Sequence, residues 1–155
     1  MSLEEDIDIL RLIPFFEGFS SEHLRLIAFS AESRSLPEKL LLYDEGQLLH
    51  SAYVVVSGRM RGERRAKAPA EPVRRAIGPG VILGERALIL DKRATESVRV
   101  EERARVLQIR KAMFRRMLQD YPEIAVALRA RLMRHVMEAS AEFSDVARRL
   151  RAMRT

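Results

Sequence analysis

The chain has 155 residues, a formal net charge of +6, 47% hydrophobic residues and 32% charged residues, which fits one globular domain. It contains no cysteine, which excludes a disulfide scaffold, a thiol nucleophile and thiolate-bound zinc or iron–sulfur sites. No apolar run approaches the roughly 18 residues of a membrane-spanning helix. The first residues are acidic, unlike a signal peptide, so we expect a cytoplasmic protein.

The charge is unevenly distributed along the chain. Residues 1–58 carry a net charge of −6, whereas residues 59–155 carry +12. The basic half would attract an anion, whether a nucleotide, a nucleic acid or an acidic partner. The alternative is an arginine-rich surface that is solvated and screened by salt.

The first 35 residues have helical spacing of apolar residues on both sides of a break at Pro14 and Gly18. Two short helices are therefore expected. Ser20 or Ser21 is suited to cap the second one. Three phenylalanines in the connection offer apolar area to pin it against a larger unit: Phe15, Phe16 and Phe19.

From residue 36 to about residue 110 the pattern changes to short apolar runs separated by turn signals. The runs are residues 40–43, 53–56, 81–83, 98–100 and 106–109. Strands at this spacing predict an all-β barrel or sandwich. The charged stretch 59–75 contains Pro69 and Pro72, so we expect strand ends around a long, exposed hairpin loop.

Helical signals return after Met113, first in a short segment and then, past Tyr121-Pro122, in a long run to the C-terminus. Apolar residues in that run are separated by 4, 4, 3, 4, 3, 4 and 3 positions: Leu128, Leu132, Val136, Ala139, Phe143, Val146, Leu150 and Met153. Such a seam favours a parallel homodimer through the C-terminal helix. The alternative is a helix that folds back onto its own domain.

Four local motifs occur in the same order as these parts: Tyr43-Asp44-Glu45-Gly46, Tyr53-Val54-Val55-Val56-Ser57-Gly58, Ile77-Gly78-Pro79-Gly80 and Gly84-Glu85-Arg86-Ala87-Leu88. With the flanking helices they resemble the cyclic nucleotide-binding domain of catabolite activators and kinase regulatory subunits. The resemblance implies a mainly β fold with flanking helices (α+β), an eight-stranded jelly-roll-like β-roll.

The parts would form one domain over residues 1–155, with N-terminal helices at 1–35, the β-roll at 36–110 and C-terminal helices at 111–155. Catabolite activators carry a helix-turn-helix module after the long helix, and this chain reaches Thr155 without one. We therefore expect a stand-alone module that does not bind DNA.

The stretch 84–88 suits a cyclic phosphate on chemical grounds. A short helix there would present backbone N–H donors, and Gly84 would permit close approach of the backbone. Arg86 could add a cation or lie on the surface. By the resemblance, Gly84, Glu85, Arg86 and Ala87 form the phosphate cassette, and Glu85 accepts a hydrogen bond from the ribose hydroxyl.

The second half of the cassette departs from the family pattern, in which an arginine that clamps the phosphate precedes a small residue, a hydroxyl residue and valine. With Val98 in register, Ser97 takes the hydroxyl position and Ala94 the place of the arginine. Arg93 is one residue early, in a turn that could absorb the shift. Glu96 would repel a phosphate, point away, or pair with Arg93 and occupy the anion site itself.

Other kinds of site find little support. The three histidines lie in different parts of the chain without metal-ligand spacing, and no nucleophile has a neighbouring base, so neither a metal site nor an enzyme is expected. The favoured hypothesis is a sensor of cAMP or cGMP that signals through its C-terminal helix, where Val136, Met137 or Phe143 could touch the base. The alternative is a degenerate, ligand-free module of the same fold that dimerises and binds an unidentified protein.

Overall fold

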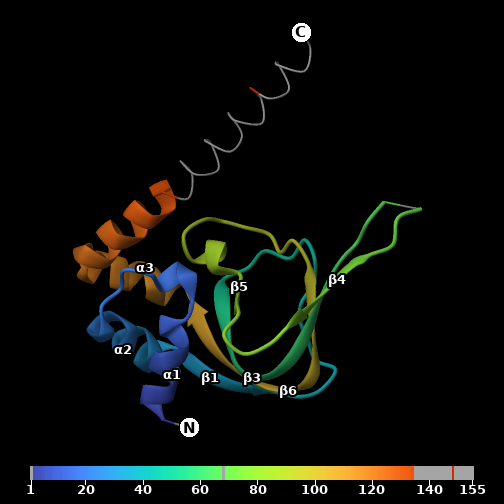
Figure 1. Ribbon diagram of the computed structural model, residues 1–155, viewed down its shortest axis with the longest axis horizontal. Coiled ribbons are helices and arrows are strands. Elements are labelled where there is room, and N and C mark those ends of the chain that lie inside the picture. Colours follow the sequence, from blue (N-terminus) through green and yellow to red (C-terminus); the bar gives the residue numbers. More distant parts are fainter. Residues whose placement is uncertain (1, 68, 135–147, 149–155) are drawn as a thin grey trace.

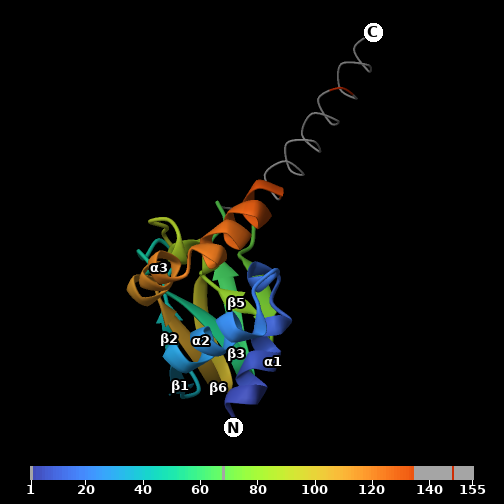
Figure 2. The same cartoon turned by 90° about the vertical axis from the view of Figure 1, so that its left-hand side faces the viewer.

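The computed structural model describes residues 2–67, 69–134 and 148. A curled antiparallel sheet forms the body of the molecule, and helices gather beside one end of it (Figure 1). The turned view, which faces that side of the molecule, shows these helices in front of the strands (Figure 2). This arrangement confirms the predicted mainly β fold with flanking helices.

Three short helices open the chain: α1 (Leu3–Arg11), the 3₁₀ helix η1 (Pro14–Phe16) and α2 (Ser21–Ser30). Ser20 caps α2 by accepting a hydrogen bond from the backbone N–H of His23, as predicted. The three phenylalanines of the connection are buried in the core, which confirms that they pin these helices to the sheet.

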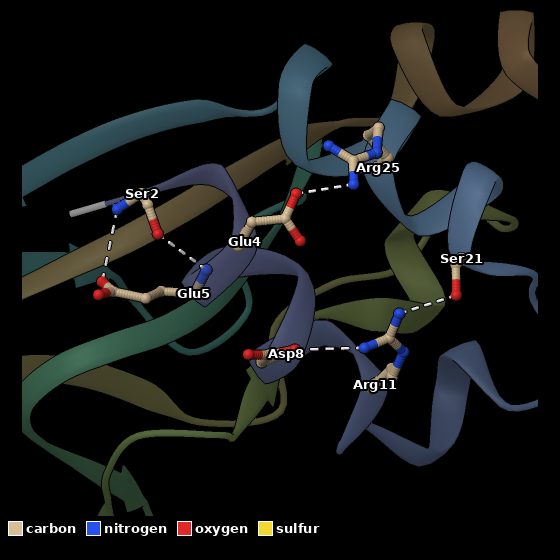
Figure 3. Close-up of polar contacts among 7 residues, drawn as sticks. All are labelled: Ser2, Glu4, Glu5, Asp8, Arg11, Ser21 and Arg25. Atoms are coloured by element: carbon tan, nitrogen blue, oxygen red, sulfur yellow. Dashed lines mark hydrogen bonds and ion pairs between the residues drawn. The ribbon is translucent and has the colours of Figure 1, made fainter.

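Polar contacts hold α1 and α2 against each other (Figure 3). Ser2 and Glu5 form a capping box at the start of α1. Arg25 of α2 lies 2.7 Å from Glu4 of α1. Arg11 donates a hydrogen bond to Ser21, which joins the end of α1 to the beginning of α2. These exposed pairs orient the helices, while the buried apolar faces supply most of the stability.

The sheet has six strands: β1 (Glu32–Leu36), β2 (Leu41–Tyr43), β3 (Ser51–Arg64), β4 (Val73–Ile77), β5 (Ile82–Leu83) and β6 (Ser97–Arg110). The order is β1-β6-β3-β4, with β2 on β6 and β5 on β3. The two long strands, β3 and β6, pair with each other, and each of the other strands of the roll pairs with one of them. Their pairing shifts register between Val55 and Met60, where Gly58 has a φ of 89°.

Two sequence expectations need correction. The first strand begins at Glu32, inside the stretch expected to be helical, because polar residues on an edge strand hide its pattern. Six strands replace the eight implied by the resemblance, since the expected runs 98–100 and 106–109 merge into the continuous strand β6, and β3 continues from the run 53–56 to Arg64. The long hairpin loop is confirmed between Arg64 and Val73.

The core has two clusters that share the sheet. One packs the helices against it and includes Leu10, Leu107 and Phe114. The other fills the roll and includes Met60 and Val98. The candidate site lies where a loop closes over the roll beside the helical cluster.

The C-terminal part begins with α3 (Lys111–Asp120), immediately after β6, and residues 122–134 are helical again. Leu128 is buried in the core, whereas Leu132 is 38% exposed. The remaining seam positions, and the three residues expected to touch a base, lie outside the described residues. Among the described helices, none is long and apolar enough to cross a membrane.

Candidate functional site

Five of the six residues predicted from the sequence line one cavity of about 360 Å³: Gly84, Glu85, Arg86, Ala87 and Arg93. The cavity is lined by the loop that carries the short helix η2 (Glu85–Leu88), and this loop follows β5 (Figure 1). Its walls also include residues from β2, β3 and β4. The structure therefore brings most of the predicted cassette together.

Gly84 is required by its backbone and by its neighbours. Its φ is 74°, a left-handed conformation that glycine adopts without strain. A Cβ there would lie 3.2 Å from Leu49 Cδ1 and 3.3 Å from the carbonyl oxygen of Ser51. The turn brings Glu85 and Arg86 to the beginning of η2, where backbone N–H groups have no acceptor within the helix.

The second half of the cassette is held by backbone hydrogen bonds to residues 46–49. Ala94 N–H donates to Gln47 O, and Gly46 N–H donates to Ala94 O, both over 2.8 Å. Arg93 forms a bridge with Leu48, and its Nη1 donates to Gly46 O over 3.0 Å. The guanidinium of Arg93 thus binds the neighbouring turn in this structure.

Ser97 is not brought into this cavity. Its hydroxyl donates to Asp44 Oδ1 and accepts from the backbone N–H of Glu45, over 2.5 and 2.8 Å. The Ser97 hydrogen bond is the largest cause of a lowered pKa for the Asp44 carboxyl. Ser97 lines a separate cavity of about 620 Å³, with Lys39, Arg61 and other residues.

Glu96 points into the cassette cavity and pairs with Arg75 of β4. The pairing with Arg93 considered from the sequence is therefore wrong. Glu96 is only 9% exposed, and Arg75 Nε donates to both carboxylate oxygens, over 2.8 and 3.0 Å. Burial, and next the charge of Glu96, raise the pKa of the neighbouring Tyr43 hydroxyl above its usual range.

Sequence reasoning missed three cations of the cavity: Arg64, Arg75 and Lys92. The first two stand on the β3–β4 hairpin, in a charged stretch that carries no apolar alternation. The signal that could have found them is the hairpin register, which pairs Gly62 with Arg75 and brings the second strand back over the roll.

A further contact ties the cassette to the helix that follows the sheet. Lys111, the first residue of α3, is buried, and its Nζ contacts Asp91 in the cassette loop. The Lys111 contact, first as a hydrogen bond and then through its charge, lowers the pKa of the Asp91 carboxyl. The loop and α3 therefore share one anchor.

The donor set of the cavity is suited to an organic anion rather than to a metal. Five cationic side chains and two carboxylates line it, together with the backbone of the glycine turn. Among the residues that the structure describes, no group of three or more histidine, cysteine, aspartate or glutamate side chains could hold a metal ion.

Many proteins are similar to this chain, and three of them illustrate the likeness. A Thermus thermophilus cyclic AMP receptor protein is 28% identical over 130 residues, which are 83% of this chain and 60% of that protein. The structure of a cyclic nucleotide-binding-like protein from Brucella abortus is 36% identical, with a TM-score of 0.67, over 74% of this chain and 98% of the other.

The third is the N-terminal domain of a Streptomyces coelicolor transcriptional regulator, 22% identical with a TM-score of 0.81 over 88% and 95% of the two chains, and it supports the fold alone. The chain spans 60% of the length of the Thermus thermophilus protein, which is less than two thirds of it. The family model for the cyclic nucleotide-binding domain matches residues 33–121, more than half of the chain. With the β-roll and its cassette, this match shows that the chain belongs to the cyclic nucleotide-binding domain family.

Proposed function

We propose that this chain is a non-catalytic, cytoplasmic regulatory module. In this proposal it binds a cyclic nucleotide, either cAMP or cGMP, in the cavity beside η2. The observation that carries the proposal is the composition of that cavity, where the Gly84 turn and the first residues of η2 face the same space as several cations. Its volume of about 360 Å³ is at the lower end of small-molecule sites. The family membership supports the same class of ligand.

In the proposed complex the cyclic phosphate lies against the beginning of η2, where unpaired backbone N–H groups and positive side chains favour an anion. Glu85 accepts a hydrogen bond from a ribose hydroxyl. Gly84 and Ala87 allow the close approach, since neither has a bulky side chain. Arg86 and Arg93 complete the proposed set, and Arg93 would bind the ligand through the nitrogens other than Nη1, which donates to Gly46 O.

The proposed signal runs from the cassette to the C-terminal helical segment. Ligand binding changes the equilibrium only if the ligand has different affinities for two positions of that segment. The Lys111–Asp91 contact supports a connection, because it joins the cassette loop to the first residue of α3. A homodimer through the seam is part of this proposal, with Leu132 as its first exposed position, since Leu128 is buried in the core of its own chain.

Isothermal titration with cAMP and cGMP tests the proposal, with AMP as a control. We expect saturable binding of a cyclic nucleotide that is weakened by Glu85→Gln and by Arg93→Ala. Arg116→Ala, an exposed arginine of α3 outside the cavity, is the matched control and should bind as the native protein does. Absence of binding of either cyclic nucleotide up to ~1 mM would overturn the proposal.

A second candidate is the ligand-free protein-interaction module. Two observations favour it: the Glu96–Arg75 pair lies in the cavity, and Arg93 is bound to a turn. A groove of about 370 Å³ between the cassette loop and residues 125–133 is lined by apolar side chains, including Ile89 and Leu118. Under this alternative the native chain and the cavity variants would bind no cyclic nucleotide and would have the same oligomeric state.

A further inference from the structure

An ion pair between Arg75 and Glu96 lines the candidate cavity. Neither residue belongs to the set that the sequence predicts to bind the phosphate. The inference drawn from this pair rests on the proposed function and deepens it. Both side chains line the cavity. They come from different elements, Arg75 from β4 and Glu96 from the turn before β6.

The sheet is built to accept the Glu96 carboxylate at this position. Gly62 of β3 pairs with Arg75 on one side and with Val98 on the other. A Cβ at Gly62 would lie 2.3 Å from Glu96 Oε1, so a side chain there would displace the carboxylate. The Glu96 side chain is 12% exposed, which makes its location a property of the packed roll rather than of a mobile surface.

Burial of a carboxylate is costly unless it is paired, and Arg75 supplies the pairing through its Nε. The guanidinium has two further nitrogens. Among the described residues, neither Nη1 nor Nη2 of Arg75 has a hydrogen-bond partner, and the side chain is 51% exposed. An anion entering the cavity would therefore meet a fixed guanidinium with unused donors.

Arg93 is placed differently. Its Nη1 is bound to Gly46 O on the turn 44–47, and among the described residues no carboxylate pairs with it. Ala94 stands where the family has its clamping arginine, so the cassette strand itself supplies no cation at that position. Arg75 is the cation that the fold holds inside the cavity by a buried partner.

We propose that Arg75 of β4 binds the anionic group of the ligand, and that Glu96 is its resident counter-ion, which holds the guanidinium in the cavity and weakens anion binding there. The ligand's phosphate and Glu96 share one guanidinium. Because like charges repel in a partly desolvated site, the affinity for an anion is set by the balance between the two residues.

The experiment compares four proteins: native, Glu96→Gln, Arg75→Gln and the double variant. Each is titrated by calorimetry with cAMP and, separately, with inorganic phosphate. Glu96→Gln should bind both about tenfold more tightly, since it removes a negative charge and keeps a hydrogen-bonding side chain. Arg75→Gln should bind them at least about tenfold more weakly. In the double variant, the gain from Glu96→Gln should be lost.

A second readout follows the Nε–H resonance of Arg75 in ¹H–¹⁵N spectra, assigned by its loss in Arg75→Gln. We expect this resonance to shift on addition of phosphate. Because Arg75→Gln leaves Glu96 buried without its partner, that variant is checked for cooperative unfolding. If it fails to fold, native, Glu96→Gln and the double variant still decide the question, because only the double variant lacks the proposed cation.

The outcomes separate this inference from the proposed function. If native protein and Arg75→Gln bind cAMP with equal affinity, the role of Arg75 is overturned. If native protein and Glu96→Gln bind cAMP with equal affinity, the role of Glu96 as a competing counter-ion is overturned. Either result leaves the proposed function standing. Tighter phosphate binding in Glu96→Gln, without cyclic nucleotide binding by any of the four proteins, supports the anion site and overturns the cyclic nucleotide.

Discussion

Replacement of Gly58 by alanine should destabilise the protein far more than the same replacement at Gly62, although both glycines lie in β3. Gly58 has a φ of 89°, and a Cβ there would lie 2.3 Å from the carbonyl oxygen of Arg103 and 2.5 Å from the Cα of Ala104. Both are backbone atoms of the paired strand β6. Neither can move without opening the bulge between the two long strands.

The magnitude follows from two costs. A left-handed residue with a side chain costs about 1–2 kcal/mol, and forcing an extra methyl into a packed site costs about 1–3 kcal/mol. We therefore expect Gly58→Ala to lower the free energy of unfolding by about 3 kcal/mol or more.

Gly62 differs because the atoms nearest to its added Cβ belong to the end of the flexible Glu96 side chain. The carboxylate can swing away, at the loss of its pairing with Arg75, while alanine gains up to about 1 kcal/mol over glycine in a strand. Loss of a buried charged hydrogen bond costs about 1–3 kcal/mol, so the net loss is about 1 kcal/mol.

Urea unfolding followed by circular dichroism measures both changes, provided that the dependence on urea stays the same. A Gly58→Ala protein within about 1 kcal/mol of the native one, or equal losses in the two variants, would refute the reasoning. Such a result would mean that the bulge adjusts to a side chain, and that the contacts around Gly58 are not a constraint.

Three further outcomes are expected. Ser97→Ala should raise the pKa of the Asp44 carboxyl toward its ordinary value, seen by carboxyl ¹³C NMR titration, and should leave cyclic nucleotide affinity unchanged; weaker binding would place the hydroxyl at the ligand. Because the pKa of Tyr43 is raised in the folded state, the hydroxyl loses its proton at a higher pH when the chain is folded than when it is unfolded. Its contribution to the free energy of unfolding is therefore fully present below about pH 10 and decreases as the pH rises further. Tyr43→Phe should therefore lose less unfolding free energy between about pH 9 and pH 11 in urea titrations, and an equal loss would contradict this. Leu132→Asp should convert a dimer to a monomer in light scattering, whereas a native monomer at high micromolar concentration would remove the seam.

The order of helices and sheet could be predicted from the sequence because apolar periodicity and turn residues are local signals. The phenylalanines after α1 and the Ser20 cap follow from such signals. Strand β1 was missed because its residues are polar and its partner, β6, lies some seventy positions later.

The site was only partly predictable for the same reason. Gly84 to Ala87 form one short segment, so the sequence identified them together. Arg75 comes from a hairpin strand that no local pattern marks, and only the pairing of β4 with β3 brings it to Glu96. The hydrogen bond from Ser97 to Asp44 depends on the turn after β2, which is far away in sequence.

Adjacent residues Glu96 and Ser97 line two different cavities at a single strand end, and the carboxylate of Glu96 is paired with Arg75 whereas the hydroxyl of Ser97 is bound to Asp44. Side chains alternate between the faces of a strand, so a slip of one residue exchanges them. Ala94, between Arg93 and Glu96, is part of the core and is hydrogen-bonded to Gly46 and Gln47, so a change in chain length there would disturb the packed roll. A substitution at position 96 or 97 instead alters one cavity and leaves the other as it is, so that ligand preference in related chains can change while the roll is conserved.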